Sequence, residues 1–146
     1  MIPVIVLVIA FAAFWLAGFV VPYFADWQLA LRAALGAMFL LTASAHWGSR
    51  RADLVRMVPR GLGDGAMWVT LTGIAEILIA MGLQVRFAAL PVAAAAALML
   101  VCVFPANAKA AREKLTIGGR PVPRLGLRLA IQVVFLGALA AAVWPH

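Results

Sequence analysis

The chain has 146 residues, of which 66% are hydrophobic and only 12% are charged, and twelve Lys and Arg residues outnumber five Asp and Glu residues. A soluble domain of this length is about half apolar and about a quarter charged, and it cannot bury so much apolar surface. The composition therefore excludes an ordinary water-soluble fold and, despite the basic excess, argues against a nucleic-acid-binding protein. It predicts a single integral membrane domain over residues 1–146.

Five hydrophobic stretches follow one another, at about residues 2–21, 29–47, 67–83, 87–106 and 127–144. Each is close to the roughly 20 apolar residues that a helix needs to cross a bilayer. The stretches are continuously apolar rather than alternating, so we predict helices and not the strands of a barrel. The first lacks the basic segment of a signal peptide, and we expect a retained helix there. The predicted fold is all-α with five membrane spans.

Basic residues are concentrated on one side of this topology. Only Arg32 and Arg86 lie on the side opposite the N-terminus. The N-terminal side carries the other ten, which are Arg50, Arg51, Arg56, Arg60, Lys109, Arg112, Lys114, Arg120, Arg124 and Arg128. Basic loops stay in the cytoplasm, so we predict a cytoplasmic N-terminus and an external C-terminus. Aromatic residues near the span ends, such as Trp47, Trp68 and Trp144, are typical of membrane interfaces.

Two connections are longer than the others. Residues 47–66 mix arginines with apolar residues, which indicates a short interfacial helix ending at Pro59, followed by a glycine-rich turn. Residues 109–126 contain the turn signal Gly118-Gly119. The alternative is that both segments are solvated connectors.

Glu76 is an ionisable residue inside the third span, nine residues after Met67 and about 13 Å along the helix. Such residues are costly in a membrane and indicate a functional site. Helical spacing predicts an apolar lipid-facing stripe and a second face directed into the bundle. The stripe contains Ile74, Ile77, Leu78 and Met81, and the inward face contains Thr72, Gly73, Glu76 and Ala80. Glu76 is then either a proton carrier or a structural hydrogen-bonding group between helices.

Other polar residues are expected near the cytoplasmic ends of the spans. His46, with Thr42 one turn earlier, is suited to proton transfer or to a polar cap at the interface. Asn107 follows Pro105 and is suited to form hydrogen bonds with the backbone groups that the proline leaves unpaired. Gln132 lies within the fifth span, where its amide requires a hydrogen-bond partner on another helix. We predict that His46, Glu76, Asn107 and Gln132 converge from four helices on a pocket for a small amphipathic ligand.

The chain has few residues that could hold a metal or a redox centre. Cys102 is the single cysteine, and His46 and His146 are the only histidines. A disulfide within the chain, a cysteine-held cluster and a thiolate zinc site are therefore excluded. We expect no metal site and no cofactor held by the chain alone, so a quinone, if present, is reduced with electrons from another protein.

Several short motifs also recur in the order and spacing of a known family. They are His46-Trp47, Met57-Val58-Pro59, Thr72-Gly73-Ile74-Ala75-Glu76, Gly82-Leu83, Val103-Phe104-Pro105-Ala106-Asn107, and Arg128-Leu129 with Gln132. Over about residues 28–144 the sequence resembles the DoxX-like membrane proteins of bacteria and archaea. The resemblance implies a four-helix transmembrane bundle in a bacterial or archaeal cell membrane, to which residues 2–21 add a fifth helix. It implies no catalytic residues.

Some DoxX-like proteins are small subunits of thiosulfate:quinone oxidoreductases, and others associate with membrane oxidoreductases. The resemblance therefore implies an accessory or anchor subunit of a membrane redox system, with a polar intramembrane pocket for a quinone or lipid-like ligand. The expected partners are the bilayer, a membrane or soluble redox protein, and further copies of the chain. Two alternatives stay open, a lipid- or isoprenoid-modifying membrane enzyme, in which a buried acid protonates an alkene, and a non-catalytic scaffold.

Overall fold

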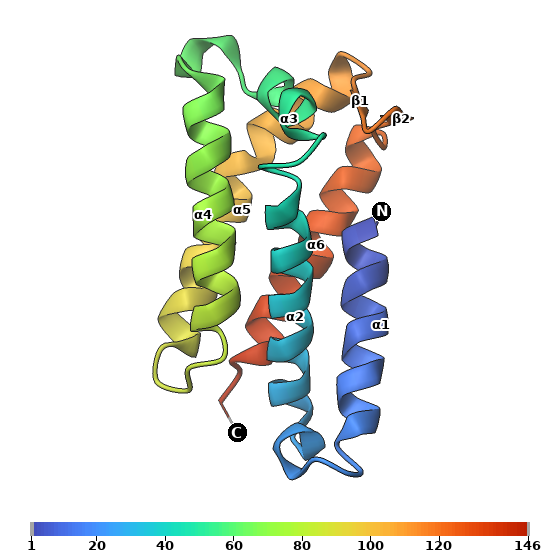
Figure 1. The fold of residues 1–146 in the computed structure, drawn as a ribbon, viewed down its shortest axis with the longest axis vertical. Helices are drawn as coiled ribbons and strands as arrows, with labels where there is room; N and C mark the ends of the chain where they lie inside the picture. The colour runs from blue at the N-terminus through green and yellow to red at the C-terminus, as the bar shows by residue number, and fades with distance from the viewer. Residues whose placement is uncertain (1, 146) are drawn as a thin grey trace.

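Four long helices form the body of the fold in the computed structural model, which describes residues 2–145 (Figure 1). They are α2 (Trp27–Ser44), α4 (Gly65–Gly82), α5 (Ala89–Arg112) and α6 (Leu125–Ala142). Each is long and apolar enough to cross a membrane. The structure thus confirms a helical bundle with several candidate transmembrane helices, as expected for a multi-pass membrane protein.

The remaining elements are short. They are α1 (Ile2–Ala17), the 3-10 turns η1 (Pro22–Ala25) and η2 (Arg60–Leu62), α3 (Arg51–Met57), and the paired strands β1 (Thr116–Ile117) and β2 (Arg120–Pro121). The segment after α2 therefore contains a short helix, α3, that ends two residues before Pro59, where the sequence predicted a short helix. The segment after α5 forms a hairpin, in which Gly118 and Gly119 adopt the positive φ angles of 58° and 75° that a two-residue hairpin turn requires.

The long helices form a ring in the order α2, α4, α5, α6, and α1 packs outside the ring against α2 (Figure 1). Half of α2 is buried, compared with 17% to 22% of the other three long helices. The largest fully buried side chains include Phe39, Leu35 and Met38 of α2 and Leu139 of α6. The central position of α2 makes it the helix on which the core and the site both depend.

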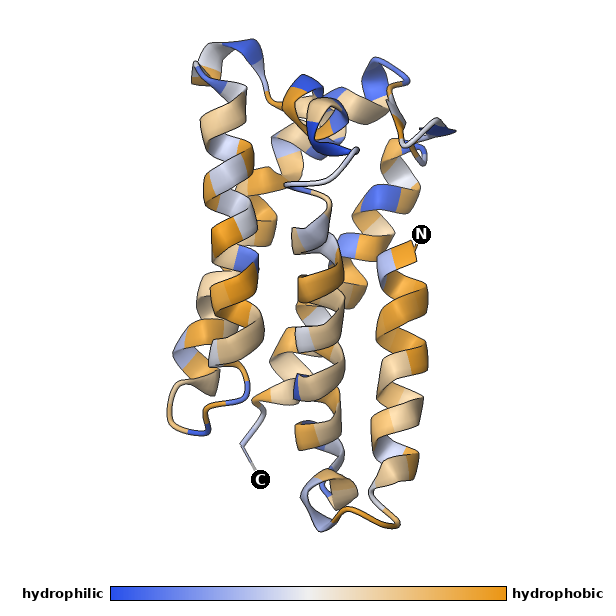
Figure 2. Ribbon diagram, viewed as in Figure 1, coloured by the Kyte–Doolittle hydropathy of each residue, from blue (hydrophilic) through white to orange (hydrophobic). Residues whose placement is uncertain are grey.

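Hydrophobic residues make up most of the long helices, whereas hydrophilic residues collect at the end that carries α3 and the hairpin (Figure 2). Leu78, Leu90 and Leu98 are each more than 60% exposed. Apolar patches of this extent indicate contact with a membrane or a partner rather than with water.

The N-terminal helix is shorter than the sequence predicts. α1 ends at Ala17 and not at residue 21, and its 16 residues span about 24 Å, less than the roughly 30 Å of a bilayer core. The chain turns at Gly18, where a Cβ atom would lie 2.6 Å from the carbonyl oxygen of Phe24. This contact fixes the end of α1, and the following Phe19 and Val20 are 89% and 85% exposed.

Polar side chains of α2 hold the end of α6, a feature that sequence reasoning missed. The Gln28 amide donates to the carbonyl oxygens of Ala141 at 3.0 Å and Trp144 at 2.8 Å, and Arg32 Nε donates to that of Ala142 at 2.8 Å. Gln28 is only 4% exposed. The last carbonyls of a helix lack partners within that helix, so these bonds fix α6 against α2.

We predict that Gln28→Leu lowers the free energy of unfolding by about 1–3 kcal/mol, because two carbonyl groups lose their donor. Thermal unfolding in detergent, followed by circular dichroism, measures the loss. Gln132→Leu is the matched control, since the Gln132 side chain makes no hydrogen bond within residues 2–145 and its replacement should leave the midpoint unchanged or raise it. Equal midpoints for the two variants would contradict the prediction.

Candidate functional site

The candidate site begins where α2 ends and the chain crosses over α4. His46 lies two residues after the last residue of α2 and is 8% exposed. It packs directly on Gly73 of α4, where a Cβ atom would lie 2.7 Å from His46 Cβ and 2.8 Å from the Trp47 ring. Only glycine allows this approach. The absence of a side chain at Gly73 therefore lets His46 pack against the backbone of α4.

His46 and Glu76 form the polar pair of the site. His46 Nδ1 lies 3.6 Å from Glu76 Oε2 and 3.1 Å from the carbonyl oxygen of Thr42, and the two side chains are 11% and 14% exposed. Because Thr42 presents an acceptor, Nδ1 carries the hydrogen in a neutral imidazole, and Glu76 Oε2 is a second, more distant acceptor for it. Glu76 Oε2 is buried and has no hydrogen-bond partner in the described part of the chain.

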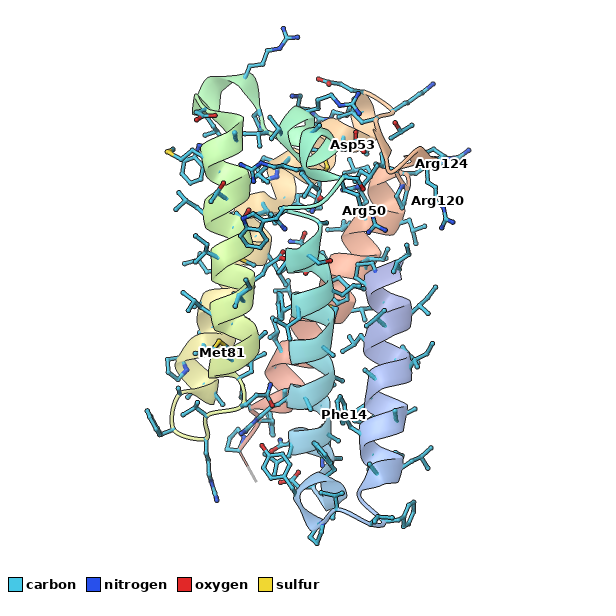
Figure 3. All side chains as sticks on the ribbon, viewed as in Figure 1. Phe14, Arg50, Asp53, Met81, Arg120 and Arg124 are labelled. Carbon is cyan, nitrogen blue, oxygen red and sulfur yellow. The ribbon has the colours of Figure 1, made fainter. Side chains whose placement is uncertain are left out.

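The predicted orientation of Glu76 into the bundle is confirmed. Ile74, Leu78 and Met81 are 45%, 62% and 64% exposed, whereas Gly73 and Ala80 on the other face are buried. Met81, labelled in Figure 3, lies near the end of α4 that is away from α3 and the hairpin. The carboxylate therefore faces protein rather than lipid.

The structure brings together only part of the predicted cluster. Thr42 adjoins the Glu76 carboxyl group, although its hydroxyl group donates to Phe39 O at 3.0 Å. Thr72 donates within its own helix, to Trp68 O at 2.9 Å. Asn107 of α5 instead accepts a hydrogen bond from Arg128 of α6 at 2.5 Å.

Gln132 makes no hydrogen bond within residues 2–145, and neither it nor Asn107 bonds to the His46–Glu76 pair. Two cavities, of about 420 and 360 Å³, are lined by residues outside the predicted cluster. In the same part of the chain, no three His, Cys, Asp or Glu side chains gather as a metal ion would require. The geometry thus reduces the candidate site to His46, Glu76 and Thr42.

Arg51 positions the site, and sequence reasoning did not distinguish it from its neighbour Arg50. Its guanidinium donates to His46 O at 2.8 Å, to Ala66 O at 3.1 Å and to Thr70 Oγ1 at 2.8 Å. One side chain therefore ties the backbone of His46 to the first turns of α4. The basic-loop pattern gave no signal of this role, because the bonds depend on how α3 folds back over the bundle.

Side chains also fix α3 and the hairpin over this end of the bundle. Lys109 Nζ donates to the carbonyl oxygens of Arg56 at 2.7 Å and Val58 at 2.8 Å, where α3 ends. Asp53 accepts from the Gly118 amide at 2.8 Å and pairs with Arg56. Figure 3 shows Asp53 beside Arg50 at the end of the bundle that carries the hairpin. These contacts join α3 to α5 and to the hairpin.

Comparison with known proteins places the chain in a family without an assigned function. A family model described as a domain of unknown function, DUF8561, matches residues 35–144, so the chain belongs to this family. No curated protein and no solved structure matches the chain. The matched segment starts within α2 and includes His46, Glu76, Asn107 and Gln132, whereas α1 lies outside it.

We predict that Gly73→Ala destabilises the fold by about 1–3 kcal/mol, because the added methyl group overlaps His46 and Trp47. The thermal midpoint in detergent and the Trp fluorescence report the effect. Gly137→Ala in α6 is the control, since no atom lies within 4 Å of the added group and alanine favours a helix. A Gly73→Ala variant as stable as Gly137→Ala would show that α2 and α4 do not need this approach.

The contact between Asp53 and the hairpin gives a pH prediction. The Gly118 amide, and then Arg56, lower the pKa of the Asp53 carboxyl group below its ordinary value of 3.8. The carboxylate therefore stabilises the docked hairpin above pH 3.8, and this contribution is lost as the pH falls through the lower pKa of the folded state. The Gly118 amide resonance should titrate with a midpoint below 3.8 and stop titrating in Asp53→Asn. A midpoint at or above 3.8 would exclude the contact.

Proposed function

We propose that this protein is an accessory or anchor subunit of a membrane redox system, and that the His46–Glu76 pair is the polar contact for a quinone or another lipid-like ligand. The buried Glu76 Oε2 atom, which lacks a hydrogen-bond donor, is the observation that carries the proposal. A buried polar atom without a partner costs about 1–3 kcal/mol. The hydroxyl group of the reduced form of the ligand, a quinol, would supply the missing donor.

The pair also has the chemistry to exchange protons with such a ligand. A quinone, when bound, would supply two-electron redox chemistry, with electrons delivered by the partner protein. Glu76 accepts a proton at Oε2, and His46 donates or accepts one at its ring nitrogens. The short path from Oε2 to Nδ1, 3.6 Å, allows a small rotation of either side chain to join the two groups.

Trp47 supports an approach from the lipid side. Its side chain is 48% exposed, its ring centroid lies 6.1 Å from that of His46, and it packs beside Gly73. An aromatic plane next to a protonatable pair suits the flat, amphipathic head of a quinone. In this proposal, the ligand enters between α2 and α4 and lies against Trp47.

The proposal includes a membrane orientation. We place the four long helices, as a DoxX-like bundle, across a bacterial or archaeal cell membrane, with the N-terminus in the cytoplasm. Because α1 is shorter than the bilayer core, the fifth span would need the apolar turn that follows it, up to residue 21. The basic residues of α3 and the hairpin share one end of the bundle (Figure 2), which supports the cytoplasmic assignment. Exposed Trp27 and Trp144 near the opposite end, and Trp47 and Trp68 near the basic end, suit the two interfaces.

Glu76→Gln tests the proposal. The amide keeps the shape of the side chain but cannot carry a proton, and we expect it to weaken quinol binding about tenfold or more, the loss typical of a hydrogen bond to a charged group. Quenching of Trp fluorescence by decylubiquinol, the reduced form, in anaerobic detergent solution measures binding, and Trp47→Phe identifies the reporting residue. Glu113→Gln, at the polar end of α5, is the matched control.

The outcomes separate function from structure. Saturable quenching that is lost in a folded Glu76→Gln variant, and native mass spectrometry showing a retained quinone or a second subunit, would support the redox role. Unchanged quenching in a folded Glu76→Gln variant would reduce the pair to a structural contact. Absence of saturable quenching in the wild-type protein would overturn the quinone assignment and leave the scaffold alternative.

A further inference from the structure

A second candidate binding site lies at the polar end of the bundle, away from the His46–Glu76 pair. A cavity of about 420 Å³ opens between the end of α3, the start of α4 and the end of α5. Its lining includes the cationic residues Arg56, Arg60 and Lys109 and a single acid, Glu113. The volume falls within the range of small-molecule sites, and the excess of positive charge selects for an anion.

Two of the cations have capacity for a ligand. Arg60 is exposed and makes no hydrogen bond or ion pair in the part of the chain that the structure describes. Lys109 Nζ uses two of its three hydrogens on the carbonyl groups at the end of α3, so one remains. Because these bonds immobilise the ammonium group, its charge is already in place before a ligand binds.

The cationic side chains, rather than the backbone, supply the positive charge. Gly65, the first residue of α4, lines the cavity, but the Asp64 side chain already caps this helix end by accepting from the Ala66 amide at 2.8 Å. The rest of the lining includes Val55, Val58, Pro59 and Leu115, which are apolar. A lining that combines cationic and apolar side chains suits a phosphate group attached to a glycerol or acyl moiety better than a free inorganic ion.

We propose that this cavity binds the phosphate group of an anionic phospholipid headgroup or of a soluble phosphate ester. Basic pockets between helices at the cytoplasmic face of membrane proteins take such groups. The site is independent of the redox proposal, because it shares no residue with the His46–Glu76 pair.

The experiment compares two arginines with the same charge and different positions. Arg60 lines the cavity, whereas Arg120 lies on the hairpin at the other side of this end (Figure 3). The protein is transferred into mixed phosphatidylcholine and phosphatidylglycerol micelles, and native mass spectrometry measures the retained phosphatidylglycerol. We expect Arg60→Gln to lower retention about fivefold, the contribution of one cation near an anionic headgroup, and Arg120→Gln to lower it less than about twofold.

The Glu113→Gln variant should change phosphatidylglycerol retention in the opposite direction. It removes the one carboxylate of the lining, so retention should rise by a similar factor. Competition with glycerol 3-phosphate then separates the sources of the phosphate. Displacement of the lipid shows that the phosphate ester itself is bound, and persistence of the lipid shows that the site requires the membrane ligand. Equal losses in Arg60→Gln and Arg120→Gln, or no rise in Glu113→Gln, would overturn the proposal in favour of a diffuse basic surface.

Discussion

Carbonyl groups at the ends of helices set the main constraint on this fold, because neither lipid nor a packed interior supplies donors for them. Long side chains from other elements satisfy these groups. Gln28 and Arg32 of α2 hold the end of α6, Arg51 holds the turn after α2, and Lys109 of α5 holds the end of α3. Each of these hydrogen bonds joins two segments of the chain. The bonds that satisfy the free backbone carbonyl groups therefore also hold the bundle together.

Glu76 is an exception to this pattern. Its Oε2 atom is a buried acceptor that makes no hydrogen bond in the described part of the chain, where the other buried side-chain atom of this kind is the donor Nε of Arg128. The nearest nitrogen, His46 Nδ1, is already directed to the Thr42 carbonyl group. An unsatisfied acceptor of this kind, on an otherwise apolar helix, distinguishes a ligand contact from a structural bridge between helices. It is the reason that the proposed function is placed at this pair and not at Asn107, which has its own partner.

The two ends of the bundle differ in chemistry. The end with α3 and the hairpin carries most of the charge, held in place by Asp53 and Lys109, whereas the opposite end exposes aromatic and apolar residues such as Phe19 and Phe87. This polarity gives the protein one surface for phosphate groups and one for the apolar membrane boundary. The His46–Glu76 pair lies between them, with Glu76 the twelfth of the 18 residues of α4 counted from the basic end.

The sequence by itself determined the class of protein, the position of the long helices to within a few residues, and the inward direction of Glu76. These follow from hydrophobic length and helical period, which are local properties of the chain. Only the tertiary structure decided which polar residues meet. Asn107 was expected in a cluster with His46 but pairs with Arg128. Arg51 was expected in an interfacial helix or a solvated connector, with no assigned partner, but it anchors His46 to α4. Such partnerships depend on the order of helices around the ring and on the close approach at Gly73, and spacing along one chain specifies neither.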